Sequence, residues 1–458
     1  MHGILSWGTY LPHRRLDRTG IAPVAGVGGG KGTRTVASYD EDTTTMGVEA
    51  ARAALRAAPA GCTPSSLWFA TVQPAYLDKT NAAAIHAALR LPRDTPAYDS
   101  LGSVRSALGA LRAGLQSSTP ALVVASDMRG GLPGSADESV GGDGAAALLV
   151  GSDDAGPVLA SVLSWATSTE EFLDRWRTPG DVRSKVWEER FGETRYVALG
   201  QEALDAALKD AGVEREQVAH LVVTGPHDRA VAAVTKASGM GDRVVDTLAA
   251  TVGNTGAAHP ALLLASALER CSPGEVVVVV TLADGADAIV LRGTDAITSH
   301  PRPRSVADQA AAGAPITYGR FLSWRGLLPV EPPRRPEPAR PSASASGRST
   351  DWKFGFVGSE DAAGEVHLPP SPLDESRRPM ADATGTIATF TVDRLAYSPS
   401  PPVVFAVVDF DGGGRLPVEL TDVDPDEVQI GARVEMVFRR LFTADGIHNY
   451  FWKGRLVP

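Results

Sequence analysis

Residues 97–111, AYDSLGSVRSALGAL, have the pattern of a short strand, a tight turn and a helix. AYDS is short enough for a buried strand, and a glycine follows it at the point where the chain must turn. VRSALGAL then places its apolar residues three and four positions apart, as one face of a helix requires. The stretch therefore predicts a βα unit whose turn, residues 101–103, presents side chains at the start of a helix.

The segments around this unit occur twice along the chain in the same order, which indicates an internal repeat. The matched pairs are EAARAAL (49–55) with EALDAAL (202–208), LWFATVQP (67–74) with HLVVTGPH (220–227), AYDS (97–100) with VVDT (244–247), PALVVASD (120–127) with GEVVVVVTL (274–282), and GDGAAALLVG (142–151) with ADGADAIVLRG (283–293). The predicted strands are continuous apolar runs, which is typical of strands covered by helices on both faces. The repeat predicts a layered α/β fold of two similar halves, at about residues 1–160 and 195–295.

The composition changes after this duplicated part. Together with the segment that follows it, the duplicated part forms a first domain of residues 1–329. Residues 330–350 are rich in Pro, Ser and Arg and predict an extended linker. Residues 381–458 hold five short alternating runs separated by Pro, Gly and Asp turns. This pattern predicts a five-stranded β-barrel of the OB-fold type.

Charge and composition exclude several classes of function. The net charge of −10 argues against a general nucleic-acid surface, because phosphate binding needs a basic face. We find no signal-peptide pattern and no long apolar run, and we expect a cytoplasmic protein with no membrane partner. The two cysteines, Cys62 and Cys271, form neither a disulfide framework nor a zinc motif by their spacing.

Several segments in the first 330 residues resemble the thiolase superfamily, in particular hydroxymethylglutaryl-CoA synthase and ketoacyl synthase III. They are GILSWGTYLP (3–12), YDEDTTTMGVEAARAAL (39–55), GPHDRAV (225–231), VGNTGAAHPALLLASALE (252–269), PGEVVVVV (273–280) and ITYGRFLSWRGLL (316–328). The resemblance implies a duplicated five-layered αβαβα core and a homodimer. It also implies acyl-CoA or acyl carrier protein as the substrate, with no further cofactor.

Enzymes of this superfamily hold the acyl group on a cysteine in the turn at the start of a helix, and a His and an Asn assist. His227 and Asn254 match the His and Asn positions. In the turn, alignment from the strand side places Ser103 at the cysteine position, whereas alignment from the helix side places Val104 there. Ser103 near a helix N-terminus is a possible nucleophile with His227 as its base, and it is equally a helix N-cap. We therefore predict a catalytic set of Ser103, His227 and Asn254.

The sequence differs from the family at a second catalytic position. Hydroxymethylglutaryl-CoA synthases use a Glu as a general base, and the matching residue here is Val72. Since the Cys and the Glu are both missing, the resemblance implies an acyltransferase or carbon–carbon condensing enzyme other than a standard hydroxymethylglutaryl-CoA synthase. The alternative is an inactive scaffold, or a partner subunit of a thiolase-like protein in an acyl-CoA-processing complex.

The C-terminal part resembles acyl-CoA-associated OB-fold proteins in which a zinc ribbon precedes the barrel. Residues 351–380 match the ribbon, but its Cys-x-x-Cys-Gly knuckle reads Glu-Asp-Ala-Ala-Gly at 360–364. Structural zinc needs four sulfur or nitrogen ligands. His367, Glu360 and Asp374 offer one nitrogen and several oxygens, so we predict no metal.

Overall fold

The computed structural model describes residues 1–301, 304–374 and 376–457. The chain divides into two compact units. Unit 1 comprises Met1–Ala37, Glu49–Ala82 and Arg93–Tyr318, and unit 2 comprises Ser38–Val48, Ala83–Pro92 and Gly319–Pro458.

Unit 1 is built on a nine-stranded mixed sheet in the order β11-β12-β13-β8-β1-β7-β6-β4-β5. The strands are β1 (His2–Tyr10), β4 (Ser66–Thr71), β5 (Ala97–Leu101), β6 (Ala121–Met128), β7 (Asp143–Ser152), β8 (Ala160–Ser168), β11 (Val218–Thr224), β12 (Val276–Leu282) and β13 (Ala286–Gly293). β6 pairs in parallel with β4 and antiparallel with β7, and β12 pairs in the same way with β11 and β13. The sheet is therefore duplicated as the sequence repeat predicts.

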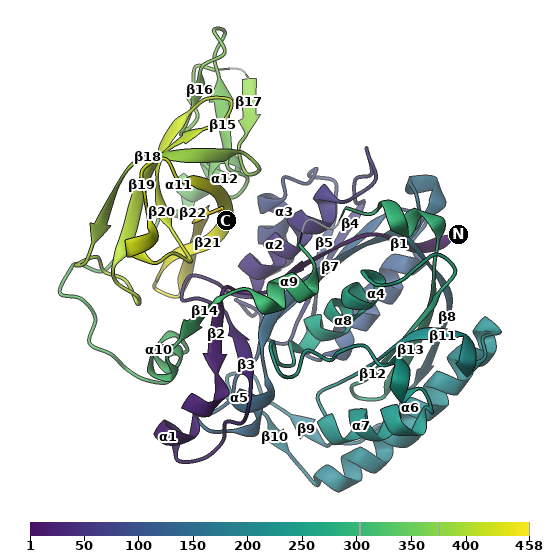
Figure 1. The fold of residues 1–458 in the computed structure, drawn as a ribbon. Helices are drawn as coiled ribbons and strands as arrows, with labels where there is room; N and C mark the ends of the chain where they lie inside the picture. The colour runs from purple at the N-terminus through teal and green to yellow at the C-terminus, as the bar shows by residue number, and fades with distance from the viewer. Residues whose placement is uncertain (302–303, 375, 458) are drawn as a thin grey trace. The chain divides into compact units, whose positions relative to one another are not determined.

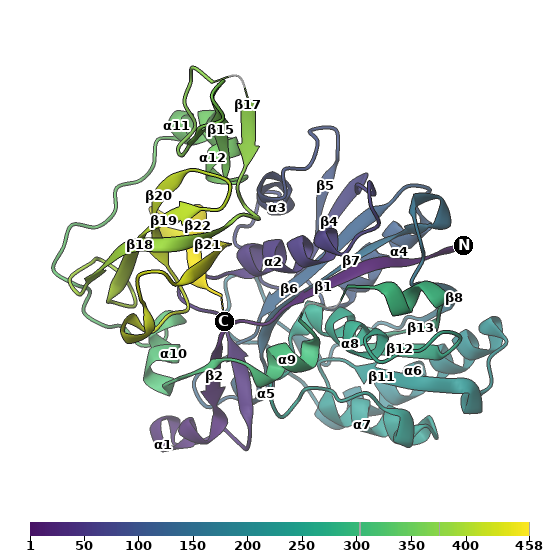
Figure 2. The ribbon, with the colours of Figure 1, turned by 45° about the horizontal axis from the view of Figure 1, so that its top comes forward.

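Helices cover the two halves of this sheet in layers (Figure 1). They are α2 (Thr43–Arg56), α4 (Arg105–Gln116), α6 (Glu189–Ala211), α7 (Asp228–Ala237) and α8 (His259–Leu268). Apolar residues of α4 and α8 form one core with β6 and β7 from one half and β12 and β13 from the other. Figure 2 shows both helices between the two halves.

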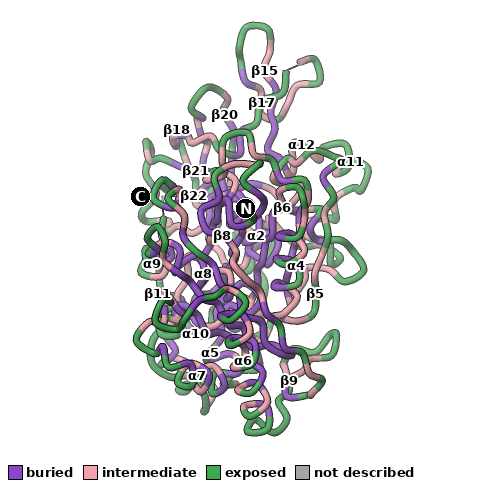
Figure 3. The backbone as a smooth tube through the Cα atoms, turned by 90° about the vertical axis from the view of Figure 1, so that its right-hand side faces the viewer, coloured by how far each residue is buried: buried purple, intermediate pink, exposed green. Residues whose placement is uncertain are grey.

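The outer layers complete the arrangement. α6 and α7 form a second core on the other face of β12 and β13. The C-terminal part of α2 packs closely on β1, since a Cβ on Gly8 would lie 2.4 Å from the Ala50 carbonyl oxygen. α8, with the sequence HPALLLASAL, is apolar on all sides and is buried along its length (Figure 3). The five layers confirm the predicted thiolase-like core.

The second repeat departs from the first at residues 244–247, where a strand matching β5 was expected. VVDT forms no strand in the described structure and touches the sheet through a single bridge between Leu221 and Val244. The Asp246 carboxylate accepts a hydrogen bond from the Leu248 amide, and Leu248 has a positive φ of 58°. This local turn ends the pairing after one bridge, so the prediction of a second matching strand is wrong.

Smaller elements complete unit 1. They are β2 (Arg14–Asp17), β3 (Thr33–Val36), β9 (Arg175–Trp176), β10 (Lys185–Val186), β14 (Ala314–Ile316), α1 (Ala22–Ala25), α5 (Ala136–Val140) and α9 (Val306–Ala311). β9 and β10 form a short hairpin in the long connection between β8 and α6. No helix in the described residues is long and apolar enough to cross a membrane.

Unit 2 contains a closed five-stranded barrel, as the sequence predicts. Its strands are β18 (Thr384–Asp393), β19 (Val403–Phe410), β20 (Arg415–Leu420), β21 (Arg433–Ala444) and β22 (Ile447–Leu456). A small sheet of β15 (Val357–Glu360), β16 (Val366–His367) and β17 (Ser376–Pro379) precedes them, together with α11 (Ala343–Arg348) and α12 (Thr350–Lys353). α11 lies in the segment for which the sequence predicts an extended linker.

A group of buried charges, which we name the barrel ion cluster, joins the 38–48 segment to the barrel within unit 2. The Lys453 ammonium lies 2.9 Å from Asp40 and also contacts Glu419. The Arg439 guanidinium lies 3.1 Å from Glu41 and 3.0 Å from Asp422. Burial alone would raise the pKa of Asp40, but Lys453 and Arg439 hold it below its usual value. Asp40 therefore remains charged beside Lys453 and Arg439 at neutral pH.

Candidate functional site

A pocket of about 390 Å³ lies in unit 1, where several strands end. It is formed by the loops after β4, β5, β6, β11 and β12, together with the segment around the β9–β10 hairpin and one residue of α6. The lining residues are 72–74, 77, 101–104, 129, 175–181, 184, 196, 226, 283 and 284. Loops from both repeats thus meet at one cavity, a common place for a ligand site.

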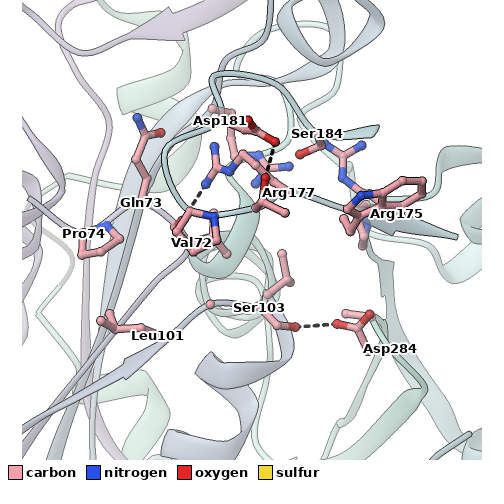
Figure 4. Close-up of a pocket in the computed structure, with 18 of the residues that line it drawn as sticks. Val72, Gln73, Pro74, Leu101, Ser103, Arg175, Arg177, Asp181, Ser184 and Asp284 are labelled. Atoms are coloured by element: carbon pink, nitrogen blue, oxygen red, sulfur yellow. Dashed lines mark hydrogen bonds between the residues drawn. The ribbon is translucent and has the colours of Figure 1, made fainter. Parts of the chain in front are cut away.

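Ser103 lines this pocket, and its position follows from the turn between β5 and α4. Gly102 has a φ of 107°, a conformation that favours glycine, and α4 begins at Arg105 with Val104 as its N-cap. The Ser103 hydroxyl donates a hydrogen bond of 2.6 Å to the Asp284 carboxylate (Figure 4). It also accepts one from the Arg105 amide at 3.1 Å, which forms a local turn two residues long. Because Val104 is the N-cap of α4, the expectation that Ser103 caps this helix is wrong.

Asp284 comes from the turn between β12 and β13 in the second repeat. It adopts a positive φ of 49°, and its amide donates a hydrogen bond of 3.2 Å to the Tyr196 hydroxyl oxygen. Its carbonyl accepts a 2.6 Å bond from Arg105, which is itself held by Asp287 at 2.8 Å. The carboxylate is thereby presented to Ser103. Sequence reasoning missed Asp284, although the ADG turn that closes the second repeat contains it.

His227 is the N-cap of α7 and is 7% exposed. Its Nδ1 accepts a hydrogen bond from the Ala230 amide, and its Nε2 lies 2.9 Å from the Glu189 carbonyl. This pair of contacts fits a neutral ring that carries its proton on Nε2. Both ring nitrogens are therefore engaged with the backbone.

Asn254 is held in a similar way by the backbone around it. Its amide nitrogen donates to the Gly225 carbonyl at 2.8 Å, and its amide oxygen accepts from the Gly256 amide at 2.9 Å. Among the described residues, those that line the pocket include Ser103 and Val104 but neither His227 nor Asn254. Of the three predicted catalytic residues, Ser103 thus lines the pocket, and the roles of His227 and Asn254 stay predictions.

Asp127, at the end of β6, connects the loops around the pocket from within the core. One carboxylate oxygen accepts hydrogen bonds from the Thr71 hydroxyl and the Val72 amide, each at 2.8 Å. The other accepts from the Ala257 amide at 2.6 Å. Burial raises the pKa of this carboxyl, and nearby Arg129 opposes the rise. Asp127 therefore fixes the Val72 loop relative to the second repeat.

The segment that resembles a zinc ribbon offers a different donor set from the one considered in the sequence. Ligand atoms of Asp361, Glu365 and His367 all lie within 4.8 Å of one another. His367 Nδ1 also contacts Asp374 at 2.8 Å. Two carboxylates and one imidazole do not fit the four sulfur or nitrogen ligands of a structural zinc site. The absence of a resident metal stays a prediction.

Comparison with known proteins identifies the family of the larger part of the chain. Hydroxymethylglutaryl-CoA synthase from Aeropyrum pernix is 30% identical over 350 residues, which cover 72% of this chain and 95% of that protein. The chain belongs to the hydroxymethylglutaryl-CoA synthase family. The synthase from Pyrobaculum arsenaticum is 27% identical over 71% of this chain and 98% of its own length.

Solved structures agree with this assignment at the level of the fold. A crystal structure of HMG-CoA synthase complexed with CoA superposes with a TM-score of 0.59 at 17% identity, covering 70% of this chain and 89% of that one. 3-Oxoacyl-(acyl carrier protein) synthase III from Pseudomonas aeruginosa gives 0.53 at 21% identity, covering 64% and 98%. Unit 1 therefore has the fold of these condensing enzymes.

The C-terminal part matches a different family model. Residues 377–439 match the model of the ChsH2 C-terminal OB-fold domain. This agrees with the closed barrel of β18 to β22. The chain thus combines a hydroxymethylglutaryl-CoA synthase-like part with an OB-fold domain, as the sequence resemblance implies.

Proposed function

We propose that this protein transfers an acyl group from an acyl-CoA or acyl carrier protein thioester to an acceptor, with Ser103 as the residue that carries the acyl group. The observation that supports this most directly is the Ser103 hydroxyl, which lines the pocket and donates to Asp284 at 2.6 Å. Membership of a family of thioester-condensing enzymes supports the choice of substrate class.

In this proposal Asp284 acts as the general base. Ser103 Oγ attacks the thioester carbonyl carbon while its proton passes to the Asp284 carboxylate. The carbon–sulfur bond then breaks, and the departing thiolate takes the proton back from Asp284. The acyl group is left as an ester on Ser103, and an acceptor nucleophile releases it in a second step. The N-terminus of α4 stabilises the negative charge that develops next to it.

His227 and Asn254 take part in this reaction if substrate binding opens their present contacts. His227 Nε2 must leave the Glu189 carbonyl, and the Asn254 amide must leave the Gly225 carbonyl. Each side chain can then donate a hydrogen bond to the thioester oxygen, the role that the family resemblance assigns to it.

The contacts of His227 and Asn254 also favour a second candidate function. If these contacts persist when a thioester is bound, His227 and Asn254 donate no hydrogen bond to the thioester oxygen. The pocket then binds the thioester without catalysing its transfer. The protein then acts as a binding or partner subunit for a thiolase-like protein, or as a homodimer that holds acyl thioesters for another enzyme.

Intact-protein mass spectrometry after incubation with short and medium acyl-CoAs distinguishes these functions. We expect a covalent acyl adduct on the native protein and on Ser65→Ala, an exposed serine outside the pocket, but none on Ser103→Ala. Consumption of acyl-CoA without an adduct would show direct transfer between two bound substrates. Neither adduct nor consumption would contradict the enzyme proposal and support the partner subunit.

A further inference from the structure

Three arginine side chains line the pocket that contains Ser103. Arg129 follows β6, whereas Arg175 and Arg177 belong to the segment of the β9–β10 hairpin. Figure 4 shows Arg175, Arg177 and Ser103 around the same hollow. These three guanidinium groups, which we name the arginine wall, share the cavity with two carboxylates, although the chain as a whole carries a net charge of −10.

Protein groups balance this positive charge incompletely. Arg175 forms an ion pair with Asp137 at 2.8 Å, but the hydrogen bond of Arg177 goes to an uncharged acceptor, the Val72 carbonyl, at 2.7 Å. Within the described part of the chain, the Arg129 guanidinium has no hydrogen-bonded partner. The carboxylate near it, Asp127, accepts its hydrogen bonds from other groups.

Neither of the two carboxylates that line the pocket accepts a hydrogen bond from these three arginines. Asp284 accepts its hydrogen bond from Ser103, and Asp181 contacts Thr178. Burial lowers the pKa of Arg129, Asp127 and Asp137 oppose this change, and the charges of Arg175 and Arg177 lower the pKa further. The three cations are thus close enough to repel one another, and a bound anion would relieve that repulsion.

We infer that the arginine wall binds a carboxylate on the acyl chain, so that the preferred substrate is a thioester of a dicarboxylic acid. Guanidinium groups match carboxylates geometrically through paired hydrogen bonds. This inference rests on the proposed thioester function. The phosphates of CoA are the other anions on such a substrate, but the long pantetheine arm separates them from the thioester carbon. An anion that shares the pocket with Ser103 therefore belongs to the acyl side.

Calorimetric binding to the full-length Ser103→Ala protein tests the inference without turnover. Succinyl-CoA and butyryl-CoA are matched probes, because both acyl groups contain four carbons and one ends in a carboxylate. We expect succinyl-CoA to bind about tenfold more tightly, as one charge-assisted hydrogen bond would provide. Addition of Arg129→Gln should abolish this preference, whereas Arg93→Gln, an exposed arginine outside the pocket, should preserve it.

Free CoA serves as the third ligand and separates the two sources of negative charge. If Arg129→Gln weakens CoA and succinyl-CoA equally, the arginines bind phosphate and the inference is overturned. Equal binding of succinyl-CoA and butyryl-CoA to the parent protein overturns it as well. Arg177→Gln provides a second variant if Arg129→Gln fails to fold. Because no acyl-enzyme is needed for binding, this test can fail while the acyl transfer through Ser103 stands, and the reverse.

Discussion

The pocket in unit 1 and the barrel ion cluster in unit 2 both gather charged side chains, but they differ in how these charges are paired. In the cluster, Lys453 and Arg439 are fully buried, and each lies between carboxylates. In the pocket, Arg129 and Arg177 are partly exposed, and no carboxylate of the described chain accepts a hydrogen bond from either.

This difference separates charges that hold the fold together from charges that are available to a ligand. Removal of one partner from a buried ion pair leaves the other charge without compensation in the interior, so the whole unit loses stability. A partly exposed charge keeps some contact with water, and its replacement changes binding more than folding. The comparison therefore predicts losses of stability from the cluster and losses of function from the pocket.

The largest effect is expected from Lys453→Met, which removes the central cation of the barrel ion cluster. It leaves Asp40 and Glu419 buried with one opposite charge fewer, and the free energy of unfolding should fall by about 3–5 kcal/mol. Urea denaturation followed by tryptophan fluorescence measures this change. Addition of Asp40→Asn to the variant should restore part of the loss, and a loss below about 1 kcal/mol would contradict the assigned role of the cluster.

Unit 1, by contrast, buries the side chain of His259 in its uncharged form. The effect of this burial can be measured as a change of stability with pH. Burial lowers the pKa of His259 from 6.5 to about 4, with nearby Arg129 contributing. Below pH 6.5 the unfolded chain binds a proton that the folded chain does not bind, so stability falls as the pH falls from 6.5 to 4. The loss should amount to about 3 kcal/mol, and His259→Gln should flatten this part of the pH profile. Parallel profiles for the two proteins would show that His259 is not the group responsible.

Asp284→Asn should affect the reaction while the fold is retained. Asn tolerates the positive φ of 49° at this position but cannot accept a proton from Ser103 as a carboxylate can. The rate of acyl-adduct formation should fall about a hundredfold, the lower end of the effect of a general base. Time-resolved mass spectrometry measures the rate, and Asp94→Asn, an exposed residue outside the pocket, is the control. An unchanged rate would remove Asp284 from the mechanism.

Much of the fold could be predicted from the sequence, because burial on both faces leaves a strong pattern. The valine run within residues 274–282 predicts a strand, and the structure has β12 there. The alternating pattern from residue 381 onward predicts the strands of the barrel, which the structure also contains. VVDT failed as a strand because the side chain of Asp246 forms a local turn, a contact that apolar periodicity does not reveal.

The site was less accessible to sequence reasoning, because it depends on contacts between distant segments. The alignment left Ser103 and Val104 as alternatives for the nucleophile position, and only three-dimensional structure shows that the Ser103 hydroxyl meets Asp284, 181 residues away. The contact of His227 with the Glu189 carbonyl likewise depends on where α6 begins. The arginine wall combines one residue after β6 with two from a hairpin, which no motif spacing connects.

The smallest effect is expected from charges that are exposed and paired at the surface. Arg433 contacts Asp411 on the barrel, and hydrogen bonds from Arg433 and Thr384 lower the pKa of Asp411 to about 2. Both side chains remain in water, so Arg433→Ala should leave the urea midpoint unchanged within error. The same measurement on Lys453→Met provides the contrast within unit 2. A comparable loss from both variants would mean that burial does not separate the two kinds of charge, and the distinction between the cluster and the pocket would then need another physical basis.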